Sequence, residues 1–269
     1  MARLPVSGME VRFRTPDGND DLAMLEAGGS VVERALVALD RLAVVEGRAV
    51  AETNTGPSWP ELTVTDFEVA LLRLRRFLFG DSMSCLFRCP AEGCGERMEP
   101  EFSISDLLDD VQPSLPKQVA RADQAEGWFS LSSGDVRFRL PTVGDQVNVV
   151  DEPRGYEELA SRCIEGKSLN ARALAQVERA MAAMAPRVSR VMEGICPACG
   201  AALKMLLYVP ELVMNELRFA AAGVHEEIHA IAAAYHWDER SILALPQVRR
   251  QAYVETIQQH AQQHARMAG

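Results

Sequence analysis

Apolar residues recur along much of the chain at spacings of three and four, the pattern of helices that bury one face. The clearest helix runs from Phe67 to Leu78, and Gly80 suits its C-terminal cap because glycine tolerates a left-handed backbone. Thr65 and Glu68 match a capping box at its start. The same spacing predicts further helices at residues 31–43, 103–108, 155–165, 170–184, 210–235, 239–244 and 246–267.

Alternating apolar and polar positions predict short strands between these helices. Two of the predicted strand pairs share one design, in which two strands flank a tight turn and a helix follows. This unit occurs twice in the chain, which we interpret as a repeated half-site rather than a solenoid. The pairs are 83–88 with 97–102 and 189–195 with 203–209; a strand at 9–14, a loop at 45–62, and a hairpin of 128–132 and 136–140 around Ser133-Gly134-Asp135 complete the prediction.

Each of the two tight turns carries a pair of cysteines, in the sequences CPAEGC and CPAC. Two thiolates from one turn can reach the same ion at about 2.3 Å, and the flanking proline and glycine suit such a turn. We therefore expect one structural zinc ion, held by Cys89, Cys94, Cys196 and Cys199, that ties the two repeats together. Four thiolates leave no open coordination position, so this site favours a structural role over an enzymatic one.

Other readings of the cysteines stay open at this point. Cys196 and Cys199 also spell a redox CxxC motif, but a nucleophilic cysteine usually opens a helix, whereas Cys199 leads into Gly200 and a predicted strand. Cys85 and Cys163 are expected to be small buried apolar residues, with Cys85 as a substitute ligand in an imperfect site.

Together these elements predict an α+β fold, with a zinc-ribbon-like β unit built on the two cysteine knuckles and a mostly helical C-terminal region. The first expected domain is an N-terminal α+β half with the first knuckle, at residues 1–110, which a polar linker with two prolines follows at 111–126. Residues 127–209 hold the hairpin, helices and the second knuckle, and residues 210–269 form the helical C-terminal region.

The composition and charge of the chain exclude some classes of function. The chain has 269 residues and a formal net charge of −10, and its pI is about 5.1, so its surface repels nucleic-acid phosphates. The basic run Arg73, Arg75 and Arg76 is short and is interpreted as a solvated helix face.

No apolar stretch approaches the roughly 18 residues of a membrane span, and the first residues show no secretory signal. We therefore expect a cytoplasmic protein, in which cysteines are metal ligands or buried thiols rather than disulfides.

The sequence HEEIH, from His225 to His229, matches the H-E-x-x-H motif of zinc metalloproteases. A third ligand is hard to find, because His236 is one residue out of register for the longer motif and Glu255 lacks a recognisable motif around it. We prefer an amphipathic helix, whose expected buried stripe is Val224, Ile228, Ile231 and Tyr235, with His225, Glu226 and Glu227 in water.

Residues 63–108, the CPACG at 196–200 and residues 226–257 together resemble the T-even-type phage baseplate hub assembly chaperone family, which occurs in contractile-tailed phages and related injection systems. The FRLP at 138–141 also matches that family. The resemblance implies a non-enzymatic role in building a tail baseplate, with hub or other tail proteins as partners and no small-molecule substrate. It implies a location in the cytoplasm of the producing bacterial cell or in the assembled particle.

The resemblance also bears on HEEIH, because a helical packing signature of the family matches His229, Tyr235, Trp237, Arg249 and Arg250. The metalloprotease motif is then coincidental. Two alternatives to a baseplate role remain: a zinc-ribbon protein-binding module of another function, and the HExxH metalloprotease.

Overall fold

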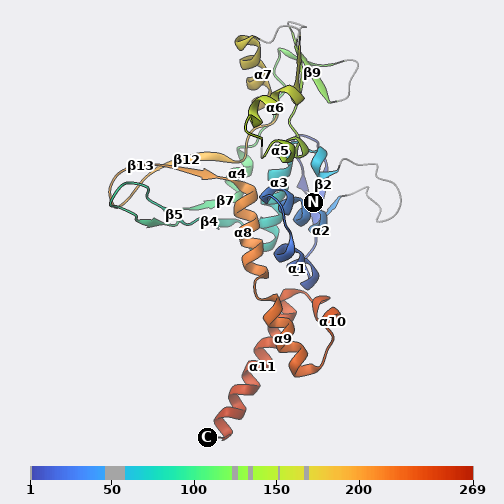
Figure 1. Cartoon of the computed structure of the whole chain (residues 1–269), viewed down its shortest axis with the longest axis vertical. Helices are drawn as coiled ribbons and strands as arrows, with labels where there is room; N and C mark the ends of the chain where they lie inside the picture. Colours follow the sequence, from blue (N-terminus) through green and yellow to red (C-terminus); the bar gives the residue numbers. More distant parts are fainter. Residues whose placement is uncertain are drawn as a thin grey trace, which may run out of the picture. The chain divides into compact units, whose positions relative to one another are not determined.

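The computed structural model describes residues 2–45, 58–122, 127–132, 136–150, 152–166 and 170–268. It is an α+β fold, as the sequence predicts (Figure 1). The chain divides into two compact units, each built from separate segments. Unit 1 comprises Met1–Arg12 and Val44–Leu212, and unit 2 comprises Phe13–Ala43 and Val213–Gly269.

Unit 1 contains most of the strands and a group of helices. Some elements cross a unit boundary, namely β2 (Glu10–Phe13), β3 (Ala43–Val45) and α8 (Val209–Ala221). Its strands are β1 (Ala2–Arg3), β4 (Ser82–Ser84), β5 (Phe87–Arg88), β6 (Arg97–Met98), β7 (Glu101–Ser103), β8 (Val119–Arg121), β9 (Trp128–Leu131), β10 (Val136–Arg139), β11 (Ile164–Gly166), β12 (Arg190–Ile195) and β13 (Ala202–Leu207). Its helices are η1 (Trp59–Glu61), α3 (Val64–Phe79), α4 (Ile104–Asp109), α5 (Val143–Val149), α6 (Gly155–Cys163) and α7 (Ala171–Met184).

Helix α3 is the central helix of unit 1, and most of its first three turns are buried. Its N-cap is Thr63, whose hydroxyl accepts the backbone N–H of Asp66 at 3.2 Å. The predicted capping box is therefore wrong, because the N-cap lies two positions before Thr65. Thr65 instead donates to the carbonyl of Pro186, and Glu68 accepts from Ser189. Both side chains are used for tertiary contacts, which outweigh the local cap.

The end of α3 agrees with the prediction, since Gly80 is the C-cap and has a φ of 89°. The predicted solvated basic face is confirmed for Arg76, which is exposed, and is wrong for Arg75. Arg75 is buried and donates to the carbonyls of Gly80 and Ser82 at 2.8 and 2.6 Å. Arg73 donates to the carbonyl of Arg3 at 2.6 Å. These guanidinium groups complete the backbone hydrogen bonding around the helix rather than forming an open basic surface.

Two narrow β-ribbons extend side by side in Figure 1 and carry the cysteine turns. In the second ribbon, β12 and β13 pair antiparallel from Arg190 with Leu207 to Ile195 with Ala202. The first ribbon is interrupted, because β4 pairs with β7 and β5 pairs with β6. The strands predicted at 83–88 and 97–102 are thus each split in two.

A four-stranded sheet of unit 1 has the order β11-β10-β9-β8, and all its pairs are antiparallel; β1, β2 and β3 form a separate three-stranded sheet. It includes a strand within the stretch predicted as the linker 111–126, since Val119 of β8 pairs with Leu131 of β9. The predicted turn at 133–135 lies outside the described residues. The core of this part joins Phe138 of the sheet to Val177 and Ala180 of α7.

Unit 2 is helical. The predicted helix at 210–235 is in fact two helices, because Gly223 is the N-cap of the second one and separates it from α8. Asp238 caps the next helix as predicted, and its side chain accepts the backbone N–H of Ser241 at 2.9 Å. The helices of unit 2 beside α8 are α1 (Gly18–Glu26), which the sequence pattern missed, α2 (Val31–Leu42), α9 (Val224–Tyr235), α10 (Glu239–Leu243) and α11 (Gln247–Ala268).

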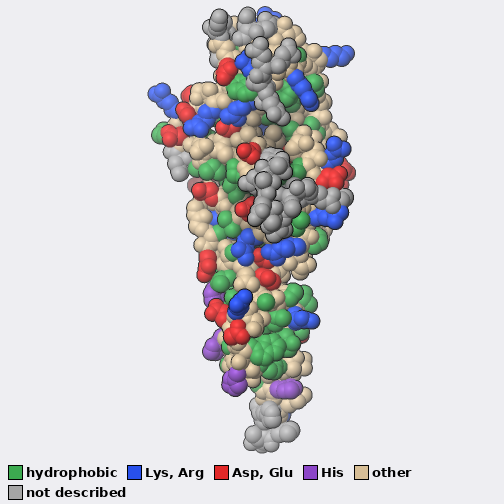
Figure 2. Space-filling model, turned by 90° about the vertical axis from the view of Figure 1, so that its right-hand side faces the viewer, with side chains coloured by type: hydrophobic (Ala, Val, Ile, Leu, Met, Phe, Trp, Pro, Cys, Tyr) green, Lys and Arg blue, Asp and Glu red, His purple; other side chains and the backbone are tan. Residues whose placement is uncertain are grey.

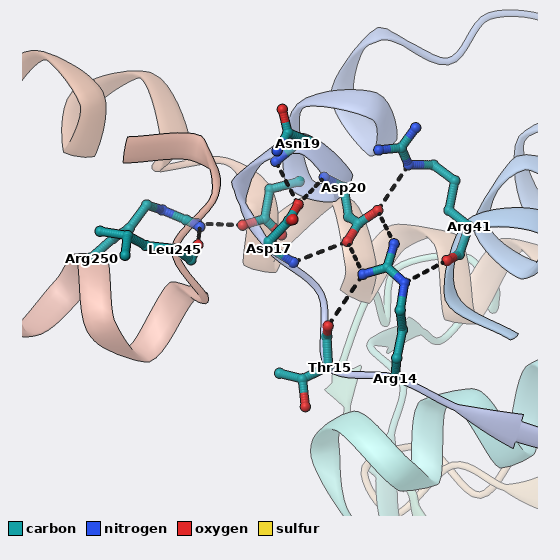
Figure 3. Close-up of polar contacts among 9 residues, drawn as sticks. Arg14, Thr15, Asp17, Asn19, Asp20, Arg41, Leu245 and Arg250 are labelled. Atoms are coloured by element: carbon teal, nitrogen blue, oxygen red, sulfur yellow. Dashed lines mark hydrogen bonds and ion pairs between the residues drawn. The ribbon is translucent and has the colours of Figure 1, made fainter. Parts of the chain in front are cut away.

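Charged side chains join the residues before α1, helix α1 and helix α2 within the segment 13–43 (Figure 3). Asp20, at the start of α1, accepts two hydrogen bonds from Arg14, at 2.6 and 2.7 Å, and one from Arg41 at 2.9 Å. Burial alone would raise the pKa of Asp20, but the bonds from Arg14, with smaller help from the Asp17 N–H and Arg41, lower it below its usual value.

Arg250 makes the contact between segments far apart in the sequence. Its side chain is 1% exposed, donates to Glu227 at 2.7 Å and to the carbonyl of Leu245 at 2.6 Å, and also bonds Asp21 (Figure 3). Gly18 lets α1 approach α10 closely, since a Cβ there would lie 2.8 Å from the Cα of Leu243. Residues 13–43 therefore belong with the C-terminal helices and not with the N-terminal half expected from the sequence.

Replacing Arg250 by methionine should destabilise the protein by about 3–5 kcal/mol, because the buried carboxylates of Asp21 and Glu227 lose their cation. The matched control is Arg249→Met, an exposed neighbour on the same helix, which should change stability by less than about 0.5 kcal/mol. Denaturant unfolding followed by circular dichroism measures both. Equal stability of the two variants would contradict the role given to Arg250.

Candidate metal centre

Each cysteine pair lies in the loop that closes a ribbon. Cys89 and Cys94 lie between β5 and β6, and Cys196 and Cys199 lie between β12 and β13. In each loop the residue after the second cysteine is a glycine with positive φ, 62° at Gly95 and 72° at Gly200. This left-handed conformation turns the chain back into the returning strand, as the flanking glycines predicted.

Backbone hydrogen bonds close both loops in the same way. The N–H of Cys89 donates to Glu96 at 2.8 Å, and the N–H of Cys196 donates to Ala201 at 2.9 Å. The first cysteine of each loop is therefore fixed where its ribbon ends. The second cysteine of each loop lies within the turn that this hydrogen bond closes. Both thiols of a loop therefore belong to the same cluster.

The structure brings all four thiols into one cluster. The sulfurs of Cys89 and Cys199 lie 3.7 Å apart, those of Cys94 and Cys196 lie 3.8 Å apart, and all four lie within 4.8 Å of one another. An ion at the centre of a tetrahedron, about 2.3 Å from each sulfur, would separate the sulfurs by about 3.8 Å. The spacing fits such an ion and is too long for disulfide bonds, whose S–S distance is about 2.05 Å.

The cluster is shielded on one side and open on the other. Cys89 and Cys196 are buried, Cys94 is half-buried and Cys199 is exposed. Leu203 is buried against the first two, and partly buried apolar side chains surround them, including Phe87 and Met98. The small apolar cluster keeps water from the inner thiols and gives the ribbons a common core.

The surroundings separate the pKa values of the thiols. The backbone N–H of Cys199, followed by smaller influences, lowers the pKa of Cys196 to about 7. At Cys89 the N–H of Ala91 lowers the pKa, but burial and the neighbouring thiols outweigh it and raise the pKa to about 12. One thiol thus ionises readily while its neighbour resists a second negative charge, and a bound cation would relieve that repulsion.

Four thiolates in a tetrahedron suit zinc or iron. Since all four positions of the ion would be filled by the protein, such a centre cannot bind a substrate directly and stabilises the fold instead. The ligands come from two ribbons whose cysteines are far apart in the sequence, so the centre joins the tip of one ribbon to the tip of the other.

The other two cysteines lie apart from this cluster. Cys163, at the end of α6, is buried, and burial raises the pKa of its thiol to about 11. Cys85 is half-buried, and burial together with the charge of Glu99 raises its pKa. The prediction of a buried cysteine is confirmed for Cys163, whereas Cys85 is only half-buried. Cys85 lies outside the four-sulfur group, and the raised pKa values keep both thiols protonated.

The HEEIH motif lies on α9, and among the described residues the four cysteines form the only close group of metal-ligating side chains. The histidine side chains that Figure 2 shows lie apart on the surface. The expected amphipathic helix needs correction in two places, since Glu227 is largely buried against Arg250 and Tyr235 is 38% exposed. Tyr235 instead packs with Trp237 and Tyr253.

Comparisons with protein-family models, with curated proteins and with solved structures find no match to this chain. Within the described residues, no helix combines the length and apolarity that crossing a bilayer requires.

Cys196→Ser should lower the metal content of the purified protein and cause it to unfold or aggregate, because an incomplete centre no longer holds the ribbons together. Cys85→Ser is the control, since Cys85 is half-buried in the first ribbon, between β4 and β5, but lies outside the cluster. Elemental analysis and size-exclusion chromatography report both effects. A monodisperse, stable, metal-free Cys196→Ser protein would show that the centre has been misread.

Replacing both His225 and His229 by alanine should leave the metal content and the melting temperature unchanged, because both side chains are exposed and belong to no metal cluster. Glu226→Gln should likewise change no peptidase activity measured on the protein. Loss of one equivalent of metal from the double variant would instead support the metalloprotease reading.

Proposed function

We propose that the protein is a non-enzymatic assembly factor or structural component of a contractile tail or injection-system baseplate, stabilised by one structural zinc ion. The proposal is supported by the resemblance of residues 63–108 and 196–200 to the baseplate hub assembly chaperone family. These two stretches contain the four cysteines, and their thiols form a single cluster. Two of the three stretches that carry the resemblance thus supply the two halves of one centre, and this observation carries the proposal.

Zinc is the metal proposed for the centre. Thiolate ligands at tetrahedral spacing suit zinc, and zinc has no redox chemistry of its own, so it can act as a permanent cross-link. Iron fits the same four sulfurs, and it would colour the protein and respond to reductants. The metal found in protein purified from its own cell decides between them.

A baseplate role requires protein partners, and the charge of the chain favours them over nucleic acid. With a net charge of −10, the protein would be repelled by phosphate backbones. Arg75 and Arg73 of the short basic run donate to backbone carbonyls, which further reduces the cationic surface available to DNA.

The protein should co-purify with baseplate hub or tube proteins from the cell that produces it, together with one zinc ion per chain. Affinity purification of a tagged chain, with mass spectrometry and elemental analysis of the same sample, measures both. An untagged strain is the control. A chain that carries one zinc and never associates with tail parts would contradict the baseplate role and favour a zinc-ribbon module of another function.

A further inference from the structure

Unit 1 contains a cavity of about 760 Å³ that is lined by none of the four clustered cysteines. Its walls come from α3, α5, α6 and α7 and from the segments around Ser189 and Tyr208. Cavities of this size accommodate a small ligand or several inserted side chains. Most of the wall is apolar, with Val64, Val149, Leu159, Ala160, Met181 and Ala182.

The polar groups that line the cavity are mostly bound to one another. Glu68 accepts hydrogen bonds from the backbone N–H and the hydroxyl of Ser189, at 2.9 and 2.6 Å. Gln146 donates to the hydroxyl of Tyr208 at 3.3 Å. The carboxylate of Glu68 is therefore already bound, whereas the buried Oε1 of Gln146 has no hydrogen-bond partner within the described residues. That oxygen can accept a bond from an occupant, and the apolar wall dominates the rest of what the cavity would bind.

One cation of the lining differs from the other. Arg187 is exposed and lies close to Glu68, where burial raises the pKa of the carboxyl overall and the charge of Arg187 lowers this pKa in part. Arg179 on α7 is also exposed, and the exposed acid beside it in the chain, Glu178, accepts a hydrogen bond from Tyr156. Arg179 is therefore the guanidinium group of the lining that is placed to meet an acidic group of an occupant.

Apolar surface continues outside the cavity. Tyr156, which lines it, is 57% exposed, and Val150, which follows the lining residue Val149, is 53% exposed. A site for a small molecule would enclose its ligand, whereas apolar surface that spreads beyond a cavity is typical of a protein–protein contact.

We propose that this cavity is the docking site for a segment of a partner protein, which inserts apolar side chains between α6 and α7 and places an acidic residue beside Arg179. The choice of a protein occupant rests on the proposed function, which requires a protein partner. The apolar wall supplies affinity, and Arg179 selects a segment with an aspartate or glutamate next to its apolar residues.

The test is a selection from a displayed library of random peptides on the immobilised full-length chain. Enriched peptides should combine apolar residues with Asp or Glu. Ala182→Trp, which fills the cavity from an exposed position of α7, should weaken their binding by at least about tenfold, the loss expected when one anchoring side chain is excluded. Ala171→Trp, at an exposed position of the same helix outside the cavity, should bind them like the unchanged protein.

A charge exchange tests the second half of the proposal. Arg179→Glu should weaken the acidic peptides, and a new selection on this variant should enrich Lys or Arg in place of Asp or Glu. Arg172→Glu, an exposed change on the same helix outside the cavity, should leave the selected sequences acidic.

Several results would overturn the docking site. The first is peptides that bind equally well to Ala182→Trp and to the unchanged protein, and the second is selected sequences that do not change with the charge at residue 179. The third concerns dodecanoate, a fatty acid that serves as a small apolar anion. If Ala182→Trp weakens the binding of dodecanoate but of no selected peptide, the cavity is a small-molecule site instead. The selection uses no tail protein, so its failure is distinct from failure of co-purification, which tests the baseplate role itself.

Discussion

Four cysteine thiols must meet at one point for the two ribbons of unit 1 to form a common core. The ribbons are narrow, each only two strands wide, and the first is interrupted between β4 and β5. A two-stranded ribbon buries little apolar surface and is marginally stable on its own. The cluster of Cys89, Cys196 and Leu203 is correspondingly small. A bound metal would contribute the stability that this core lacks, which makes the centre the constraint on which the ribbons depend.

In unit 2, charged side chains instead of a metal centre join parts of the chain that are distant in sequence. Its segments, one early and one late in the chain, are joined by Arg250 through Asp21 and Glu227. A buried ion pair of this kind adds little net stability over a well-packed apolar core, but removing one partner is costly. Its contribution is therefore to specify which helices pack together. In both units, residues distant in sequence are joined by a few polar or metal-binding side chains with strict geometry.

The parts of the fold that sequence could predict are those set by local chemistry. The cysteine knuckles, with their proline and glycine neighbours, predicted both loops and the four-sulfur cluster, and Gly80 and Asp238 predicted helix ends. The failures came where distant contacts decide. Thr65 and Glu68 looked like a cap but bond to Pro186 and Ser189, more than a hundred residues away. Arg75 looked like a surface charge, and only the folded chain shows the carbonyls to which it donates. The carboxylates around Arg250 come from Asp21 and Glu227, which the sequence alone does not bring to it.

The account is tested most directly by X-ray absorption at the zinc edge on the chain purified from its producing cell. It predicts one zinc per chain with four sulfur neighbours at about 2.3 Å and no nitrogen or oxygen in the first coordination sphere. Two results would contradict this prediction. One is zinc bound by nitrogen or oxygen at about 2.0 Å, as the histidines of HEEIH would provide. The other is a protein that stays folded without any metal.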